Sequence, residues 1–125
     1  MNLDLRKLFI VDDDEMLSMM LSDHLSGHNF EIDVFETGEK CLDHIDQTPD
    51  IIILDYNLNS VDPDAANGLQ ILKAIKEINK EVLIIMYSSQ EQYGPALDLI
   101  REYGVEYLIK DDQAFSKIEN IIINH

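Results

Sequence analysis

The sequence predicts an α/β fold in which helices cover both faces of a five-stranded parallel sheet. Three continuous apolar runs, at residues 8–11, 51–54 and 82–86, have the composition of strands that are buried on both faces. Helical patterns separate these runs, and the clearest one places the apolar side chains of residues 69–78 on one face. Strands that alternate with helices in this way form a parallel sheet with right-handed crossovers.

The length and charge of the chain narrow its class. Its 125 residues are the size of one domain, so we expect a single domain over residues 1–125. Twenty-five acidic and 9 basic residues give a net charge of −16, which would repel nucleic acid and anionic membranes. We therefore expect no direct nucleic-acid partner and no membrane partner. The single cysteine, Cys41, excludes an internal disulfide and fits a cytoplasmic protein.

The first half of the chain predicts two strands, each followed by a helix. Residues 7–11 form the first strand, and a helix runs from Asp14 to about Ser26 with Gly27 as its stop. Residues 30–34 alternate apolar and polar side chains, which places the second strand at an edge of the sheet. A short second helix covers about residues 37–45.

The second half predicts three further strands and three further helices. In chain order, these elements are a strand at 51–55, a polar loop at 57–67, a helix at 69–78, a strand at 82–86, a helix at 95–102, a strand at 106–109 and a last helix that buries Phe115, Ile118 and Ile122. Pro95 suits the first turn of its helix, and Gly104 suits the end of the same helix.

The strand patterns also predict an order within the sheet. The three continuous apolar strands belong in its centre, whereas the alternating second strand and the short fifth strand belong at its edges. This matches a doubly wound, flavodoxin-like (βα)5 fold with strand order 2-1-3-4-5. In such sheets a ligand binds beyond the carboxyl ends of strands one and three. The residues at those ends are Asp12, Asp13 and Asp55.

Three carboxylates at one site repel each other, and two arrangements relieve the repulsion. One carboxylate takes up a proton, or a hard cation such as Mg²⁺ or Mn²⁺ neutralises the group. A plainer interpretation also stands for each residue. Asp12 and Asp13 can belong to a helix cap with solvated charge, and Asp55 alone can be a turn residue.

Two more strand ends add polar groups to this edge of the sheet. Ser88 follows the fourth strand and offers a hydroxyl, and Lys110 follows the fifth strand and offers a compact cation. Taken alone, Ser88 is more often a turn residue and Lys110 is more often a surface lysine. Together with the carboxylates they suit phosphoryl transfer, in which a carboxylate attacks while cations neutralise charge on the transferred group.

With these residues in place, the chain resembles the receiver domain of two-component response regulators, in particular a chemotaxis-type regulator. The segments that carry the resemblance are Leu8–Asp14, Pro49–Asp55, Asn67–Glu77, Ile85–Ser88 and Gly104–Lys110. They span nearly the whole chain in the order typical of that family.

The resemblance implies a role for each candidate residue. Asp55 would accept a phosphoryl group from the phosphohistidine of a sensor histidine kinase or a histidine phosphotransfer protein. Asp13 and Asp55 would bind Mg²⁺ (or Mn²⁺) directly, Asp12 mostly through water, and Asn57 through its backbone carbonyl. Lys110 would hold phosphoryl oxygens. The chain would thus promote its own Mg²⁺-dependent aspartyl phosphorylation and dephosphorylation without being a conventional enzyme.

The resemblance also implies a switch. Ser88 would move to the phosphoryl group and Tyr107 would turn inward behind it. This would remodel the face of the fourth helix, fifth strand and fifth helix, where a downstream protein or a second copy would dock. Asn57 and Gln90 occupy positions that tune the lifetime of the acyl phosphate in the family.

The chain departs from the family pattern in three places. The loop from Asn57 to Gly68 is several residues longer. It either caps the site, slows phosphotransfer or selects a partner, or it is a tolerated insertion. Asp111 replaces the usual proline after Lys110, so the Lys110–Asp111 peptide is either trans, with Lys110 aimed differently, or a strained cis bond. Ser88 replaces the commoner threonine.

Other protein classes explain the pattern less well. A flavodoxin needs a phosphate-binding loop of small and hydroxyl residues after strand one, where this chain has carboxylates. A haloacid-dehalogenase-type phosphatase needs a second aspartate shortly after Asp55, and this chain has Tyr56 and Asn57 there. The alternative that we keep is a receiver-like module that binds proteins without phosphorylation. We expect no metal or catalytic role for the four histidines, and we expect Met16, Met19 and Met20 to pack in the core.

Overall fold

The computed structural model describes residues 5–59, 61–89 and 95–125, and it forms five strands and five α-helices. The strands are β1 (Arg6–Val11), β2 (Phe30–Phe35), β3 (Ile51–Asp55), β4 (Leu83–Ser88) and β5 (Glu106–Ile109). The helices are α1 (Glu15–Leu25), α2 (Gly38–Asp43), α3 (Gly68–Ile78), α4 (Pro95–Glu102) and α5 (Ala114–Ile123), with a 3₁₀ turn η1 (Ile45–Gln47) after α2. All strand pairs are parallel, and the order β2-β1-β3-β4-β5 confirms the predicted fold.

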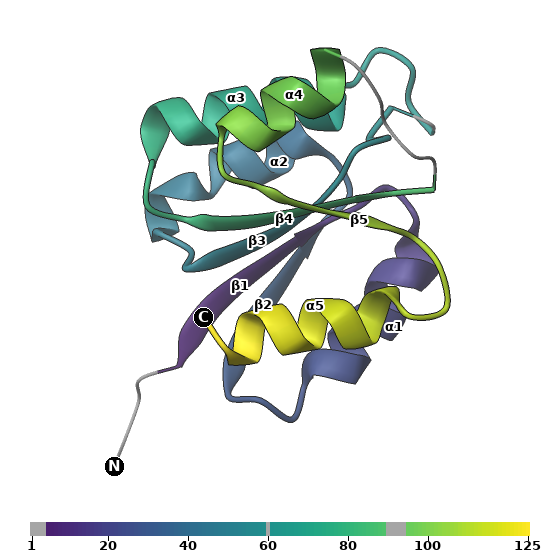
Figure 1. The fold of residues 1–125 in the computed structure, drawn as a ribbon, viewed down its shortest axis with the longest axis vertical. Helices are drawn as coiled ribbons and strands as arrows, with labels where there is room; N and C mark the ends of the chain where they lie inside the picture. The colour runs from purple at the N-terminus through teal and green to yellow at the C-terminus, as the bar shows by residue number, and fades with distance from the viewer. Residues whose placement is uncertain (1–4, 60, 90–94) are drawn as a thin grey trace.

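Helices cover both faces of the sheet (Figure 1): α1 and α5 lie on one face, and α2, α3 and α4 lie on the other. The apolar residues of the central strands alternate between the two layers. In β4, for example, Ile84 and Met86 pack toward the α2–α4 layer, whereas Ile85 and Tyr87 pack toward α1 and α5. Every residue of β3 is buried, as the continuous apolar run predicts.

Local signals explain where the first helices begin and end. Asp14 caps α1 by accepting a hydrogen bond from the Leu17 N–H, and this helix ends at Leu25. This end lies within one residue of the predicted one, and Gly27 directly follows the C-cap Ser26. The left-handed residue before β2 is Asn29, with φ of 60°. Helix α2 starts after Thr37 as predicted but ends at Asp43, since the chain tightens there into the 3₁₀ turn.

The elements that frame the site have equally clear signals. Asn67 and Gln70 form a reciprocal capping box that starts α3. Strand β4 begins one residue later than predicted and continues through Ser88, because its ladder pairs with β5 as far as Ile109. Gly104, with φ of 70°, ends the turn after α4, where the left-handed backbone favours glycine.

The expectation for the α1 methionines is wrong. Met16, Met19 and Met20 are 72, 65 and 54% exposed. Helix α1 turns Leu21 and Leu25 into the core, and its methionines therefore lie on the outward side. Three exposed methionines in two turns of helix form an apolar surface that the hydrophobic core does not explain.

Candidate functional site

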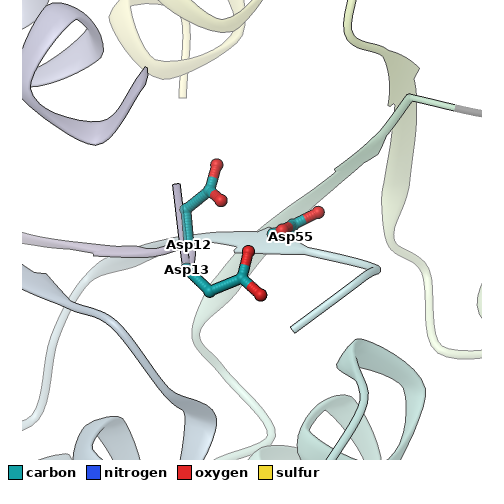
Figure 2. Close-up of side chains that lie close together, drawn as sticks. All are labelled: Asp12, Asp13 and Asp55. Carbon is teal, nitrogen blue, oxygen red and sulfur yellow. The ribbon is translucent and has the colours of Figure 1, made fainter. Parts of the chain in front are cut away.

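The register of the sheet brings the predicted carboxylates together. Val11 of β1 pairs with Leu54 of β3, so that the next residues, Asp12 and Asp55, lie side by side at the carboxyl ends of these strands. Asp12 and Asp55 are each 1% exposed. Figure 2 shows these two side chains with Asp13, and one carboxylate oxygen from each lies within 4.8 Å of the others. Three clustered carboxylates are a donor set that fits a hard divalent cation.

Asp55 is electrostatically perturbed. Burial first, and then the nearby charge of Asp12, raise the pKa of its carboxyl, and the net result of all contributions is a rise from 3.8 to about 7. The Lys110 ammonium and the backbone N–H of Asn57, which donates to Asp55 Oδ1 at 3.1 Å, act in the opposite direction and hold the pKa down. A carboxylate in this state is poised to gain a proton, a cation or a covalent partner.

Lys110 provides the balancing charge. Its Nζ lies 3.2 Å from Asp12 Oδ2 and 3.2 Å from Asp55 Oδ1, so one ammonium bridges two buried carboxylates. The described residues contain no cis peptide, so the Lys110–Asp111 bond is trans. Lys110 nevertheless reaches the site, because its backbone N–H donates to the Ser88 carbonyl at 2.7 Å and holds the end of β5 against β4.

The other predicted residues take different positions around this centre. Ser88 is fully buried at the end of β4, and its Oγ lies 3.2 Å from Asn57 Nδ2 as hydrogen-bond acceptor. Tyr107 lies in β5 and packs, half-buried, against the core under α2, α3 and α4. Gln90 lies outside the described residues.

Tyr87 was not predicted from the sequence to belong to the site. Its hydroxyl donates to Asp12 Oδ2 at 2.5 Å, and Lys110 Nζ lies 4.6 Å from the centre of its ring. Burial and then the charge of Asp12 raise the pKa of this phenol well above its usual value, so the hydroxyl keeps its proton and acts as a donor. The available signal was a phenol in a fully buried strand that ends beside an acidic cluster, because a buried tyrosine hydroxyl requires a partner.

The long loop after β3 reaches the edge of the site. The backbone N–H of Val61 donates to Asp13 Oδ2 at 3.2 Å, and the Ala66 N–H donates to Glu39 Oε2 at 2.9 Å. A groove of about 620 Å³ opens beside Asp13, with Val61 on one side and the α1 methionines Met16 and Met19 on the other. The extra residues therefore form part of the surface next to the carboxylates.

A comparison with known proteins agrees with this geometry. The family model of the response regulator receiver domain matches residues 8–122. The chain belongs to this family. The receiver domain is 29% identical to the chemotaxis protein CheY of Bacillus subtilis over 117 residues, which are 92% of this chain and 93% of CheY.

Longer relatives match over one part of their length. The DNA-binding transcriptional regulator NtrC of Klebsiella pneumoniae is 26% identical, and the match covers 94% of this chain and 25% of NtrC. Among solved structures, a CheY-like receiver domain from Methanospirillum hungatei superposes with a TM-score of 0.82 at 20% identity, over 97% of this chain and 94% of that one. This receiver domain thus spans the length of CheY and a quarter of NtrC.

Family membership gives the site its general setting. Receiver domains bind Mg²⁺ at an acidic aspartate cluster, and this one has such a cluster in Asp12, Asp13 and Asp55. Receiver domains also act between histidine kinases and downstream effectors. No helix within the described ranges is long and apolar enough to cross a membrane.

Proposed function

We propose that Asp55 of this receiver domain accepts a phosphoryl group from the phosphohistidine of a sensor kinase or phosphotransfer protein, with Mg²⁺ (or Mn²⁺) at the carboxylate cluster. The observation that carries this proposal is the single ammonium of Lys110, which lies 3.2 Å from both Asp12 and Asp55 beside that cluster. This arrangement combines a nucleophile, a metal-binding carboxylate group and a cation for the transferred group, as phosphoryl transfer requires.

Each residue has a defined part in the transfer. A carboxylate oxygen of Asp55 forms a bond to phosphorus, and the phosphorus–nitrogen bond of the donor breaks. The bonding electron pair stays on the imidazole nitrogen. The other ring nitrogen of the donor carries a proton before the transfer, so the imidazole leaves as neutral histidine. Bound Mg²⁺, held by Asp13, Asp55 and the Asn57 carbonyl and through water by Asp12, would neutralise charge on the phosphoryl oxygens. The Lys110 ammonium, which now pairs with the Asp55 carboxylate, would pair with a phosphoryl oxygen after the transfer.

The switch would begin at Ser88. Its hydroxyl now pairs with Asn57 Nδ2, and it would turn to the phosphoryl group once Asp55 is modified. Tyr107, which is half-buried, would then move inward behind Ser88. The face of α4, β5 and α5 would change with it and bind a downstream protein or a second copy of the chain.

The groove beside Asp13 supports approach of the donor protein from the α1 side. Met16, Met19 and Val61 offer apolar contact at 72, 65 and 75% exposure, and Asp14 and Glu15 add negative charge at its edge. A donor with apolar side chains flanked by basic ones would complement this surface.

Chemical phosphorylation tests the proposal. Incubation with acetyl phosphate and Mg²⁺ should add the mass of one phosphoryl group, in a linkage that is stable to acid and labile to base. Asp55→Asn should show no such gain, and EDTA should prevent the gain in the native chain. An equal gain in Asp55→Asn, or none in the native chain, would contradict the phosphoacceptor role.

The alternative is a module that binds proteins without phosphorylation. The hydrogen bond from the Val61 N–H to Asp13 favours it, because the loop then occupies an oxygen of a metal ligand. Two results together would support this function instead. The native chain would gain no phosphoryl group, and the native chain and Asp55→Asn would bind the same partner protein with equal affinity.

A further inference from the structure

Tyr87 is a polar side chain in an apolar layer. It is fully buried in β4 and packs with Ile85, Ile53 and Ile118 between the sheet and helices α1 and α5. A hydroxyl buried without a hydrogen bond is strongly destabilising, whereas phenylalanine or leucine would fill an apolar position without that demand. Packing alone therefore does not explain the hydroxyl, and its partner does.

That partner is Asp12, and the same side chain also contacts Lys110. The Tyr87 hydroxyl donates to Asp12 Oδ2 at 2.5 Å, and the ring centre lies 4.6 Å from Lys110 Nζ, in the range of a cation–π contact. Lys110 Nζ in turn lies 3.2 Å from Asp12 Oδ2. Tyr87 thus contacts the Asp12 carboxylate through its hydroxyl and the Lys110 ammonium through its ring.

These contacts leave Asp12 little freedom. Its Oδ2 receives the Tyr87 hydroxyl and the Lys110 ammonium, and its Oδ1 receives the Asp14 backbone N–H at 2.9 Å. Both carboxylate oxygens are therefore held in fixed directions. Such outer contacts orient metal-binding carboxylates, and their loss typically weakens metal affinity by about 10–100-fold.

We propose that Tyr87 is a positioning residue of the phosphoryl-transfer site, whose hydroxyl fixes the Asp12 carboxylate and whose ring fixes Lys110 within reach of Asp55. This role rests on the proposed function for its use in phosphoryl transfer. The positioning itself is a property of the unphosphorylated protein and can be measured there.

The two contacts predict different results for two variants. Tyr87→Phe keeps the ring and removes the hydroxyl, so Mg²⁺ binding should weaken about tenfold in calorimetric titration, as the loss of an outer-shell contact predicts. In NMR spectra, the ε-methylene protons of Lys110 should keep their upfield ring-current shift. Tyr87→Leu removes both groups, so Mg²⁺ binding should weaken and the Lys110 shift should disappear.

Ile85→Val is the matched control, because Ile85 lies in the same strand and the same apolar layer but away from the carboxylates. It should lower the midpoint of urea unfolding while leaving Mg²⁺ affinity and the Lys110 resonances unchanged. Urea unfolding curves for all three variants identify the urea concentrations at which each protein is folded.

Three outcomes would overturn the positioning role. These are a Tyr87→Phe affinity for Mg²⁺ within about twofold of the native value, a Lys110 shift that persists in Tyr87→Leu, and a native protein that binds no Mg²⁺. The phosphoacceptor role fails separately. A native protein that gains no phosphoryl group from acetyl phosphate, while Tyr87→Phe still weakens Mg²⁺ binding, would refute the proposed function and retain the role of Tyr87.

Discussion

The floor and the rim of the site are held by different means. The floor consists of Asp12, Asp55, Tyr87 and Lys110; the first three are at most 1% exposed, and their positions follow from strands of the sheet or their immediate ends. The rim consists of Asp13 in the loop before α1, Met16 and Met19 in α1, and Val61 in the long loop. Met16, Met19 and Val61 are each at least 65% exposed. Core packing thus fixes the chemical groups, and the surface beside them can vary without moving them.

The largest expected effect comes from removing the cation of the floor. Lys110→Ala leaves Asp12 and Asp55 buried together without their shared partner, so in EDTA at pH 8 the free energy of unfolding should fall by about 3–5 kcal/mol. Urea unfolding measures the loss. Lys40→Ala is the control, because the ion pair of Lys40 with Glu36 is more than half exposed and contributes at most about 1 kcal/mol. Similar losses in both variants would remove the distinction between a buried and a solvated pair.

The charge of Asp55 should make the metal-free floor sensitive to pH. Since folding raises the pKa of Asp55 from 3.8 to about 7, the native protein holds this proton more tightly than the unfolded chain. Stability should therefore fall as pH rises from 4 to 7, by on the order of 4 kcal/mol in the limit of full ionisation. Asp55→Asn removes this ionisation, so it should recover part of the loss at pH 8 and little at pH 5, measured by urea unfolding in EDTA. A stability difference between the two proteins that does not change with pH would show that Asp55 titrates normally.

A backbone contact joins the floor to the helix that follows the rim loop. A Cβ at Gly68 would lie 2.4 Å from the Asp55 carbonyl oxygen and 2.6 Å from the Tyr56 Cα, which are backbone atoms of the last residue of β3 and of the residue after it. Gly68→Ala should therefore destabilise the protein by about 1.5 kcal/mol in thermal or urea unfolding. Gly27→Ala is the control, because no atom lies within 4 Å of its added Cβ. A neutral result for Gly68→Ala would mean that the start of α3 shifts freely, and the floor would then be less rigid than its burial indicates.

The same contrast explains how far the sequence alone could lead. The apolar run before Asp55 predicted β3 to the residue, because a strand buried on both faces tolerates few polar side chains. Parallel strands end at one edge of the sheet, so Asp12, Asp55 and Lys110 were expected together and the structure brings them together. The position of β3 and the meeting of these three residues follow from the hydrophobic pattern and from the sheet topology that this pattern predicts.

Other parts depend on side-chain direction and loop path. The hydroxyl of Tyr87 meets Asp12 only because β4 turns that residue toward α1, and no hydropathy pattern encodes its partner. The outward side of Met16 and Met19 depends on which residues of α1 face the sheet. The loop after Asp55 has no periodicity, so the contact between Val61 and Asp13 could not be predicted.

The smallest expected effect on stability lies at the rim, where it separates folding from recognition. Val61 is 75% exposed, so Val61→Ser should change the free energy of unfolding by less than about 0.5 kcal/mol. Phosphorylation by acetyl phosphate should keep its rate, because that donor is too small to need the groove between Val61 and the α1 methionines. Transfer from a phosphorylated histidine protein should slow through a higher KM, since part of the apolar contact is lost. Ile78→Ser, at an exposed site where α3 ends away from the carboxylates, should change neither rate. If Val61→Ser slows phosphorylation by both donors equally, the loop affects the floor through the hydrogen bond from the Val61 N–H to Asp13. The floor and the rim would then not be independent.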